Sequence, residues 1–146
     1  MKLSEAFDMY GKYIAIKGQS SRTIEHNDYV KRRLVAIIGD IKLNRLSLDD
    51  IYKWKNTMAI GKLPDGSPVK RSQNSLRCDI LRVRAMLKYM DIIGEPCLNY
   101  RLVPVPKRED IQRTFLNESE VASMIKSAYS LRNQFIISLL YSSGKF

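Results

Sequence analysis

The spacing of apolar residues constrains the fold of this chain most, because they recur every three or four positions in segment after segment. The most regular stretch, which starts near Ser72, carries one unbroken stripe: Leu76, Ile80, Val83, Leu87 and Met90. Residues at this spacing share one face of an α-helix, whereas in a strand they would fall on both faces. The chain is therefore predicted to be all-α, a small bundle of helices that bury such stripes against one another.

Three more helices are predicted before this one, and capping residues or glycines mark their ends. The first ends at Gly18, and the second runs from the SSRT segment, residues 20–23, to Gly39. The third opens at Ser47, with Asp50 in the position that a capping box requires. A glycine just past the last turn is a common way for a helix to stop. These signals predict four main helices.

The chain is predicted to contain one domain, a linker and the start of a second domain. Residues 1–97 form the helical domain, with a possible short hairpin near 61–71 around a Pro-Asp-Gly turn. Residues 98–115 carry a Pro-Val-Pro sequence and mixed charge, which is typical of an extended linker. Residues 116–146 begin with a capping-box pattern and continue into a helix, 131–141, that is apolar nearly all round.

The net charge points to a polyanionic partner. The chain has 25 Lys and Arg against 15 Asp and Glu, a formal charge of +10. Three of the bases and two of the acids lie beyond residue 113, so the excess belongs to the first part of the chain. A positive field of this size attracts nucleic acid above all. Basic proteins that bind nothing anionic also exist, so charge alone does not decide the question.

Two rows of cationic residues refine this prediction. On a helical wheel, Arg22, Tyr29 and Arg33 share one side of the second helix, at a spacing of i, i+7 and i+11. Arg77, Arg84 and Lys88 repeat that spacing on the fourth helix. Ridges of this kind can meet successive phosphates and base edges in a major groove. The alternative is that both are the solvated faces of ordinary helices. His26 lies at the edge of the apolar face, which favours a core or boundary role.

No pattern for catalysis, a metal or a cofactor is present in the sequence. It has no Gly-rich phosphate loop and a single histidine, which leaves little basis for a triad or a zinc site. Cys78 and Cys97 are predicted to be free thiols of a protein in the reducing cytoplasm. No apolar run approaches the length that spans a membrane. As an enzyme in its own right, the chain is a poor candidate.

The order of these segments resembles the N-terminal half of tyrosine recombinases, the phage-integrase and Xer-type site-specific DNA recombinases. Four stretches carry the resemblance: SSRTIEHNDYVKRRL, PDGSPVKRSQNSLRCDILRVRAMLKYM, VPVPKRED and FLNESEVASMIKSAYSLRNQFIISLLYSSG. Together they cover nearly the whole chain. The individual motifs are degenerate, and it is their order and spacing that match.

The resemblance implies a SAM-like, core-binding helical domain that grips one face of double-stranded DNA, followed by the first helices of a catalytic domain. It implies that the second and fourth helices cross in the major groove, so that both ridges lie together in it. The residues implied in DNA contact are Arg22, Arg33, Lys70, Arg71, Asn74, Arg77, Arg84 and Lys88, of which Lys70 and Lys88 would meet phosphates. DNA integration and recombination would be the activity of a full-length parent.

The resemblance carries no catalytic residue into this chain. Ser143 and Gly144 stand where the family has a Thr-Gly turn, and Phe146 stands where it has its first catalytic arginine. The lysine, the His/Arg box and the tyrosine nucleophile would follow beyond Phe146. On this interpretation the last helix lacks the domain that would surround it, so we expect a homo-oligomer, formed through this C-terminal segment or on DNA. The residues expected to mediate it are Phe135, Ile136, Leu139 and Leu140.

Three functions therefore remain open from the sequence. The first is the DNA-binding part of a site-specific recombinase. The second is a natural, truncated DNA-binding regulator without catalysis. The third is a basic helical module that binds acidic protein. The first two predict DNA binding that weakens steeply with salt, and the third does not.

Overall fold

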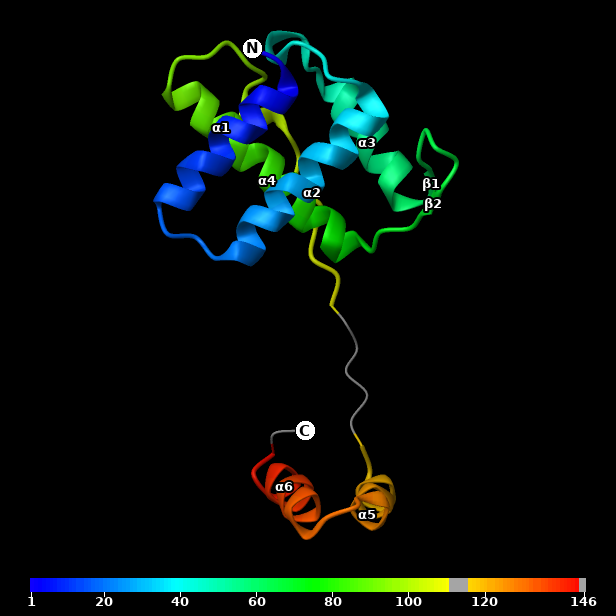
Figure 1. Ribbon diagram of the computed structural model, residues 1–146. Helices are drawn as coiled ribbons and strands as arrows, with labels where there is room; N and C mark the ends of the chain where they lie inside the picture. Colours follow the sequence, from blue (N-terminus) through cyan, green and yellow to red (C-terminus); the bar gives the residue numbers. More distant parts are fainter. Residues whose placement is uncertain (111–115, 145–146) are drawn as a thin grey trace. The chain divides into compact units, whose positions relative to one another are not determined.

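A computed structural model describes residues 1–110 and 116–144 of the chain, which divides into two compact units, Met1–Glu109 and Asp110–Phe146 (Figure 1). Both units are helical, which confirms the predicted all-α class. Phe146, which the resemblance aligns with a catalytic arginine, and the last part of the predicted linker, residues 111–115, lie outside the described residues. No helix in the described part of the chain is both long and apolar enough to span a bilayer.

Unit 1 is built from four main helices, as predicted. These are α1 (Leu3–Ile16), α2 (Ser21–Ile38), α3 (Leu48–Ala59) and α4 (Gln73–Ile92). One short 3₁₀ turn, η1 (Leu43–Arg45), lies between α2 and α3, and another, η2 (Tyr100–Leu102), comes after α4. Helix α4 packs against α1, α2 and α3, and Figure 1 shows it crossing both α1 and α2. The crossing of α2 and α4 is the part of the fold that positions the candidate site.

The predicted apolar stripe of α4 lies in the core of unit 1. All five of its residues are buried, together with Phe7 of α1, Leu34 of α2 and Trp54 of α3. Each large apolar side chain removed from water in this way contributes about 1.5–3 kcal/mol. The helical spacing seen in the sequence therefore reflects one shared core.

The helix ends follow the predicted caps. Ser20 accepts a hydrogen bond from the backbone N–H of Thr23 at 3.3 Å, and α2 ends at Gly39 in a positive-φ conformation. At α3, Ser47 and Asp50 bond each other's backbone N–H groups at 3.2 and 2.9 Å, a complete capping box. The predicted hairpin is present as two strands, β1 (Gly61–Lys62) and β2 (Pro68–Val69), which pair antiparallel.

The first part of the segment predicted as a linker belongs to unit 1. Residues 98–109 pack along α4, and Val103 is only 1% exposed in the core. This differs from the predicted domain end at residue 97. The physical reason is that Val103 buries apolar surface, while the backbone of residues 106–109 receives hydrogen bonds from α4, as described below.

Unit 2 is a pair of helices, α5 (Glu118–Ser127) and α6 (Leu131–Ser142). Asn117 and Glu120 form the predicted capping box at the start of α5. Helix α6 leaves most of its apolar side chains in water, and Phe135 is 66% and Leu139 55% exposed. A helix that is apolar on every side normally lies in an interior.

Candidate nucleic-acid interface

Helix α2 carries a straight row of side chains at the edge of its buried face. Arg22, His26, Tyr29 and Arg33 follow one another at spacings of four, three and four residues, so they lie on one side of the helix. Arg22 is exposed, and the other three are half-buried. The row that the sequence predicted from Arg22, Tyr29 and Arg33 is thus present, and His26 belongs to it.

A buried carboxylate on α4 fixes this row to the rest of unit 1. Asp79 is 0% exposed and accepts two hydrogen bonds from Arg71, one from Nε at 3.0 Å and one from Nη2 at 2.9 Å. It also accepts one from Nε2 of His26 at 2.8 Å. The hydrogen bonds to Asp79 raise the pKa of Arg71 above its ordinary value. A buried charge needs such partners, because leaving it unpaired is costly.

The ring of Tyr29 joins two guanidinium groups. Arg71 lies 4.8 Å and Arg33 5.4 Å from the centre of this ring. The ring of His26 stacks near it, with the two centroids 6.5 Å apart. Cation–π contacts of this type hold a guanidinium in place without neutralising its charge. The arrangement keeps two guanidinium groups together at one spot of the surface, where Asp79 compensates the charge of one of them, Arg71.

A hollow lies between the start of α2 and the adjoining side of α4. It has a volume of about 320 Å³. Its lining consists of Ser20, Arg22, Thr23, His26, Cys78 and Arg82. Two arginines, from different helices, thus face the same space. The described residues that line it include no carboxylate.

Two residues predicted for DNA contact, Asn74 and Arg77, bind the protein's own backbone in the structure. Asn74 donates to the carbonyl of Glu109 at 3.1 Å and accepts from its N–H at 2.9 Å. Arg77 donates to the carbonyl of Pro106 at 2.7 Å. Gln73 donates to the carbonyl of Lys107 at 2.8 Å. The N-terminal part of α4 therefore holds the backbone of residues 106–109.

The two predicted ridges do not meet in the way the sequence suggested. Arg82 lies five residues after Arg77, which is about 140° further around the helix axis, and it is Arg82 that reaches the hollow with Arg22. Arg84 is half-buried and Lys88 exposed, both on the side of α4 that carries Arg77. The structure brings Arg71 and Arg82 to the row on α2, and it directs Arg77 to residues 106–109.

Two residues of this surface were missed from the sequence. Asp79 interrupts the buried stripe between Leu76 and Val83, and an acid in such a place indicates that it has a paired partner, which in the structure is Arg71. Arg82 follows three residues after Asp79, on the same side of the helix. That placement could have indicated it. Lys70, which was predicted, is exposed between β2 and α4.

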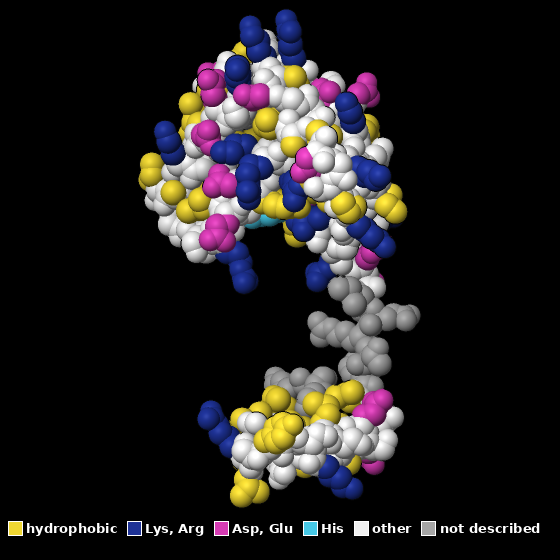
Figure 2. Space-filling view, turned by 45° about the vertical axis from the view of Figure 1, so that its right-hand side comes forward, with side chains coloured by type: hydrophobic (Ala, Val, Ile, Leu, Met, Phe, Trp, Pro, Cys, Tyr) yellow, Lys and Arg dark blue, Asp and Glu magenta, His cyan; other side chains and the backbone are white. Residues whose placement is uncertain are grey.

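The visible face of unit 1 carries both positive and negative side chains. Figure 2 shows Lys and Arg side chains across the visible face of unit 1, interspersed with acidic ones. Near the arginines at the α2–α4 crossing, Asp79 is buried and already paired with Arg71, whereas the exposed Asp65 lines a separate hollow with Arg33. Only Arg22 and Arg82 of these arginines line the hollow at the start of α2, whose described lining has no carboxylate.

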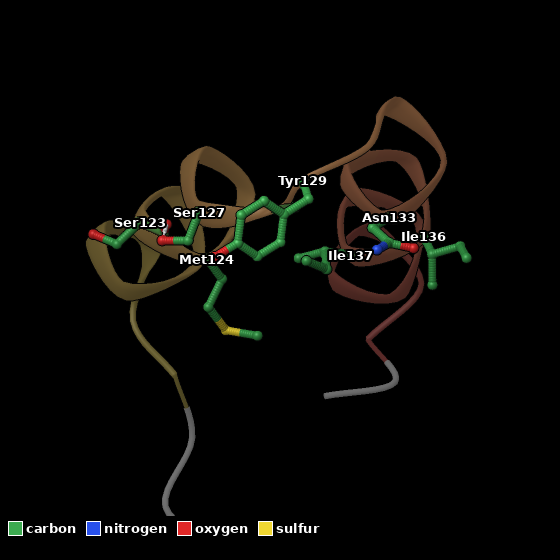
Figure 3. A pocket seen from close by; sticks show the side chains of 8 residues that line it. Ser123, Met124, Ser127, Tyr129, Asn133, Ile136 and Ile137 are labelled. Carbon is green, nitrogen blue, oxygen red and sulfur yellow. Dashed lines mark hydrogen bonds between the residues drawn. The ribbon is translucent and has the colours of Figure 1, made fainter.

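The described residues of unit 2 offer an apolar surface and no comparable cluster of charge. Figure 2 shows hydrophobic side chains gathered on its visible face, and Figure 3 shows an open hollow between α5 and α6, of about 510 Å³. Met124 and Tyr129 reach into it from one side and Ile137 from the other. Of the residues predicted for self-association, Ile136 lines this hollow. The others, Phe135, Leu139 and Leu140, are exposed.

Comparison of the chain with protein-family models, with curated proteins and with solved structures finds no match.

Proposed function

We propose that this chain binds double-stranded DNA through the surface where α2 and the first half of α4 meet. We propose further that it does so as the DNA-binding part of a tyrosine-recombinase-type protein. The resemblance in segment order supports the second statement. The cationic surface of unit 1 supports the first.

One observation carries the proposal: four arginines from three segments of the chain lie around one crossing of helices. Arg33 and Arg71 share the ring of Tyr29, and Arg22 and Arg82 share a hollow. Guanidinium groups bind phosphate oxygens with two parallel hydrogen bonds, and they also read guanine in the major groove. A surface with several such groups fits a duplex better than a single small anion.

Helix geometry supports the same ligand. The first backbone N–H groups of α2, beside Ser20 and Arg22, have no acceptor within their own helix, and this end carries the positive pole of the helix dipole. Phosphate groups bind readily at such ends. The duplex would then lie across the start of α2, with its backbone close to Arg22.

Strand cleavage is not part of this proposal, because no residue of the chain matches a catalytic group of the family. Binding to DNA is the step in which unit 1 would act. The protein would work in the cytoplasm, and Cys78 and Cys97, which are both free thiols, are compatible with a reducing compartment. Unit 2 would pair with a second copy through its exposed apolar side chains.

The experiment is a titration of a labelled duplex, followed by fluorescence anisotropy over a series of salt concentrations. We expect log K to fall linearly with log salt, each neutralised phosphate adding about 0.9 to the slope. The double variant Arg22→Glu/Arg33→Glu should bind at least about tenfold more weakly, a loss of about 1.4 kcal/mol or more.

The matched control is Lys12→Glu/Arg45→Glu, which changes the net charge equally at exposed positions on α1 and η1. It should keep most of the affinity, because the general field changes but the proposed contacts remain. Equal losses in both variants would show attraction by net charge alone. A protein that binds no duplex, but binds an acidic protein, would favour the helical interaction module instead.

A further inference from the structure

We infer that the hollow between the start of α2 and the side of α4 is a phosphate-binding site, in which Arg82 and Arg22 hold one phosphate group. The inference rests on the proposed function for the source of that group, a phosphodiester of the DNA backbone. It adds Arg82, on a side of α4 that neither the helical wheel nor the resemblance selected.

The first support is an unpaired donor. The Nε of Arg82 is buried, and among the described residues no hydrogen-bond partner for it is present. Buried polar groups in proteins are nearly always paired, since an unpaired one loses its bonds to water without replacement. Arg82 also lines the hollow. Nε itself is closed to solvent, so a bound oxyanion would meet the part of the Arg82 side chain that lines the hollow and would compensate its charge there.

The second support is the chemistry of the other walls. Arg22 brings a second guanidinium, and Ser20 and Thr23 bring hydroxyl groups that lie 3.1 Å from each other. Two carboxylates are neighbours in sequence of lining residues: Asp79 is occupied by Arg71 and His26, and Glu25 is exposed and does not line the hollow. Donors therefore dominate the hollow, and the positive end of α2 adds to them. This combination selects a tetrahedral anion such as a phosphate ester.

The third feature provides a direct measurement. Cys78 is exposed in the wall of the same hollow, so a group bound there would shield its thiol from alkylation. Cys97 is half-buried elsewhere in unit 1, and burial raises the pKa of its thiol. The thiolate is the reactive form, so Cys97 is a slow internal reference.

The experiment measures the alkylation rate of each cysteine by iodoacetamide, with mass spectrometry, on the full chain. The additions are none, a duplex at saturating concentration, and inorganic phosphate at the same concentration of phosphate groups. We expect the duplex to slow alkylation of Cys78 several-fold and to leave Cys97 unchanged. Inorganic phosphate should protect Cys78 much less, because it lacks the other contacts of a duplex.

Variants identify the groups that hold the phosphate. In Arg82→Gln, the duplex should protect Cys78 less at an equal bound fraction, and the salt slope should fall by about 0.9, the contribution of one phosphate. The control Arg32→Gln, an exposed arginine that does not line the hollow, should keep full protection. Circular dichroism of both variants shows whether unit 1 stays folded. The protection of Cys78 in the wild-type chain tests the site even if a variant fails to fold.

The outcomes separate this inference from the proposed function. A duplex that binds with a salt-dependent affinity, yet leaves Cys78 as reactive as before, overturns the phosphate site and leaves DNA binding intact. A chain that binds no duplex overturns both. Protection by inorganic phosphate as strong as that by the duplex supports the phosphate site but overturns DNA as its source.

Discussion

Arg71 and Asp79, eight residues apart in the chain, are joined by two hydrogen bonds in which one planar guanidinium meets one fully buried carboxylate. Arg71 precedes α4, whereas Asp79 lies on its buried face. The pair therefore fixes the approach of the chain to the helix, and it places Arg71 against Tyr29. Arg71, which the resemblance implies in DNA contact, is thus also part of the fold of unit 1.

Replacing Arg71 by Ala should therefore lower the stability of the free protein. The change leaves Asp79 buried with His26 as its remaining partner, and an acceptor deprived of a partner costs about 1–3 kcal/mol, or more when it is charged. Urea unfolding followed by circular dichroism measures the loss. Arg71→Lys should recover only part of it, because an ammonium cannot present the two parallel donors.

The control for this prediction is Arg32→Ala, which removes an exposed arginine of α2. Its effect should stay within about 0.5 kcal/mol, as for most surface substitutions. If Arg71→Ala and Arg32→Ala unfold at the same urea concentration, the buried pair does not stabilise unit 1.

Replacing Asn74 by Ala should loosen the contact between the start of α4 and residues 106–109. Asn74 makes both of its hydrogen bonds with the backbone of Glu109, and each such bond contributes about 0.5–1.5 kcal/mol. Hydrogen exchange measured by mass spectrometry should become faster in residues 105–110 and stay unchanged in the middle of α4. The control, Lys88→Ala, removes an exposed side chain of the same helix and should alter neither. Unchanged exchange at Glu109 in the Asn74 variant would contradict the role of this contact.

The helices could be predicted from the sequence because their signals are local. The stripe of α4, the cap at Ser20 and the capping box at Ser47 all act within a few residues, and all are present. The packing of residues 98–109 could not be predicted in this way. Gln73 and Asn74 bond backbone groups more than thirty positions away. Every residue has the same backbone groups, so the sequence does not indicate which of them such a side chain will meet.

The candidate site could be predicted only in part, for a related reason. A helical wheel shows that Arg22 and Arg33 share a side of α2, but it does not show which side of α4 crosses that row. The crossing angle depends on how the two cores fit together. This packing places Arg82, rather than Arg77, in the hollow with Arg22. The buried Asp79, three residues before Arg82, is the one feature of the sequence that indicates which side of α4 faces α2.

Stability should also depend on pH through Asp40. Its carboxylate accepts hydrogen bonds from the backbone N–H of Ser4 at 2.9 Å and from the Ser4 hydroxyl at 2.8 Å. The backbone bond is the main cause that holds the pKa of Asp40 below its ordinary value of 3.8. A carboxyl whose pKa is lower in the folded protein stabilises it above the unfolded pKa, and this contribution is lost as pH falls through the folded pKa.

Asp40→Asn tests this dependence. At neutral pH the variant should be less stable than the parent, by less than about 1 kcal/mol because the carboxylate is exposed to water. The difference should shrink below pH 3.8 and vanish once Asp40 is protonated in both states. Urea unfolding over this pH range gives the measurement, with Glu25→Gln as a control for the loss of an exposed carboxylate. A difference that stays constant with pH would exclude the charge of Asp40 as the cause.

The apolar surface of α6 should drive self-association of the chain. Phe135 and Leu139 lie four residues apart on one side of α6, and both are more than half exposed. Burying each against a second copy would contribute about 1.5–3 kcal/mol, whereas the salt concentration should matter little. Light scattering after size-exclusion chromatography should show a molar mass that rises with protein concentration, and Phe135→Ser/Leu139→Ser should keep the chain monomeric. The control Ile16→Ser/Ile92→Ser removes two apolar residues of unit 1 that are 87% and 71% exposed. If this control abolishes association equally, unit 2 is not the interface, and a parent that is monomeric at every concentration overturns the pairing itself.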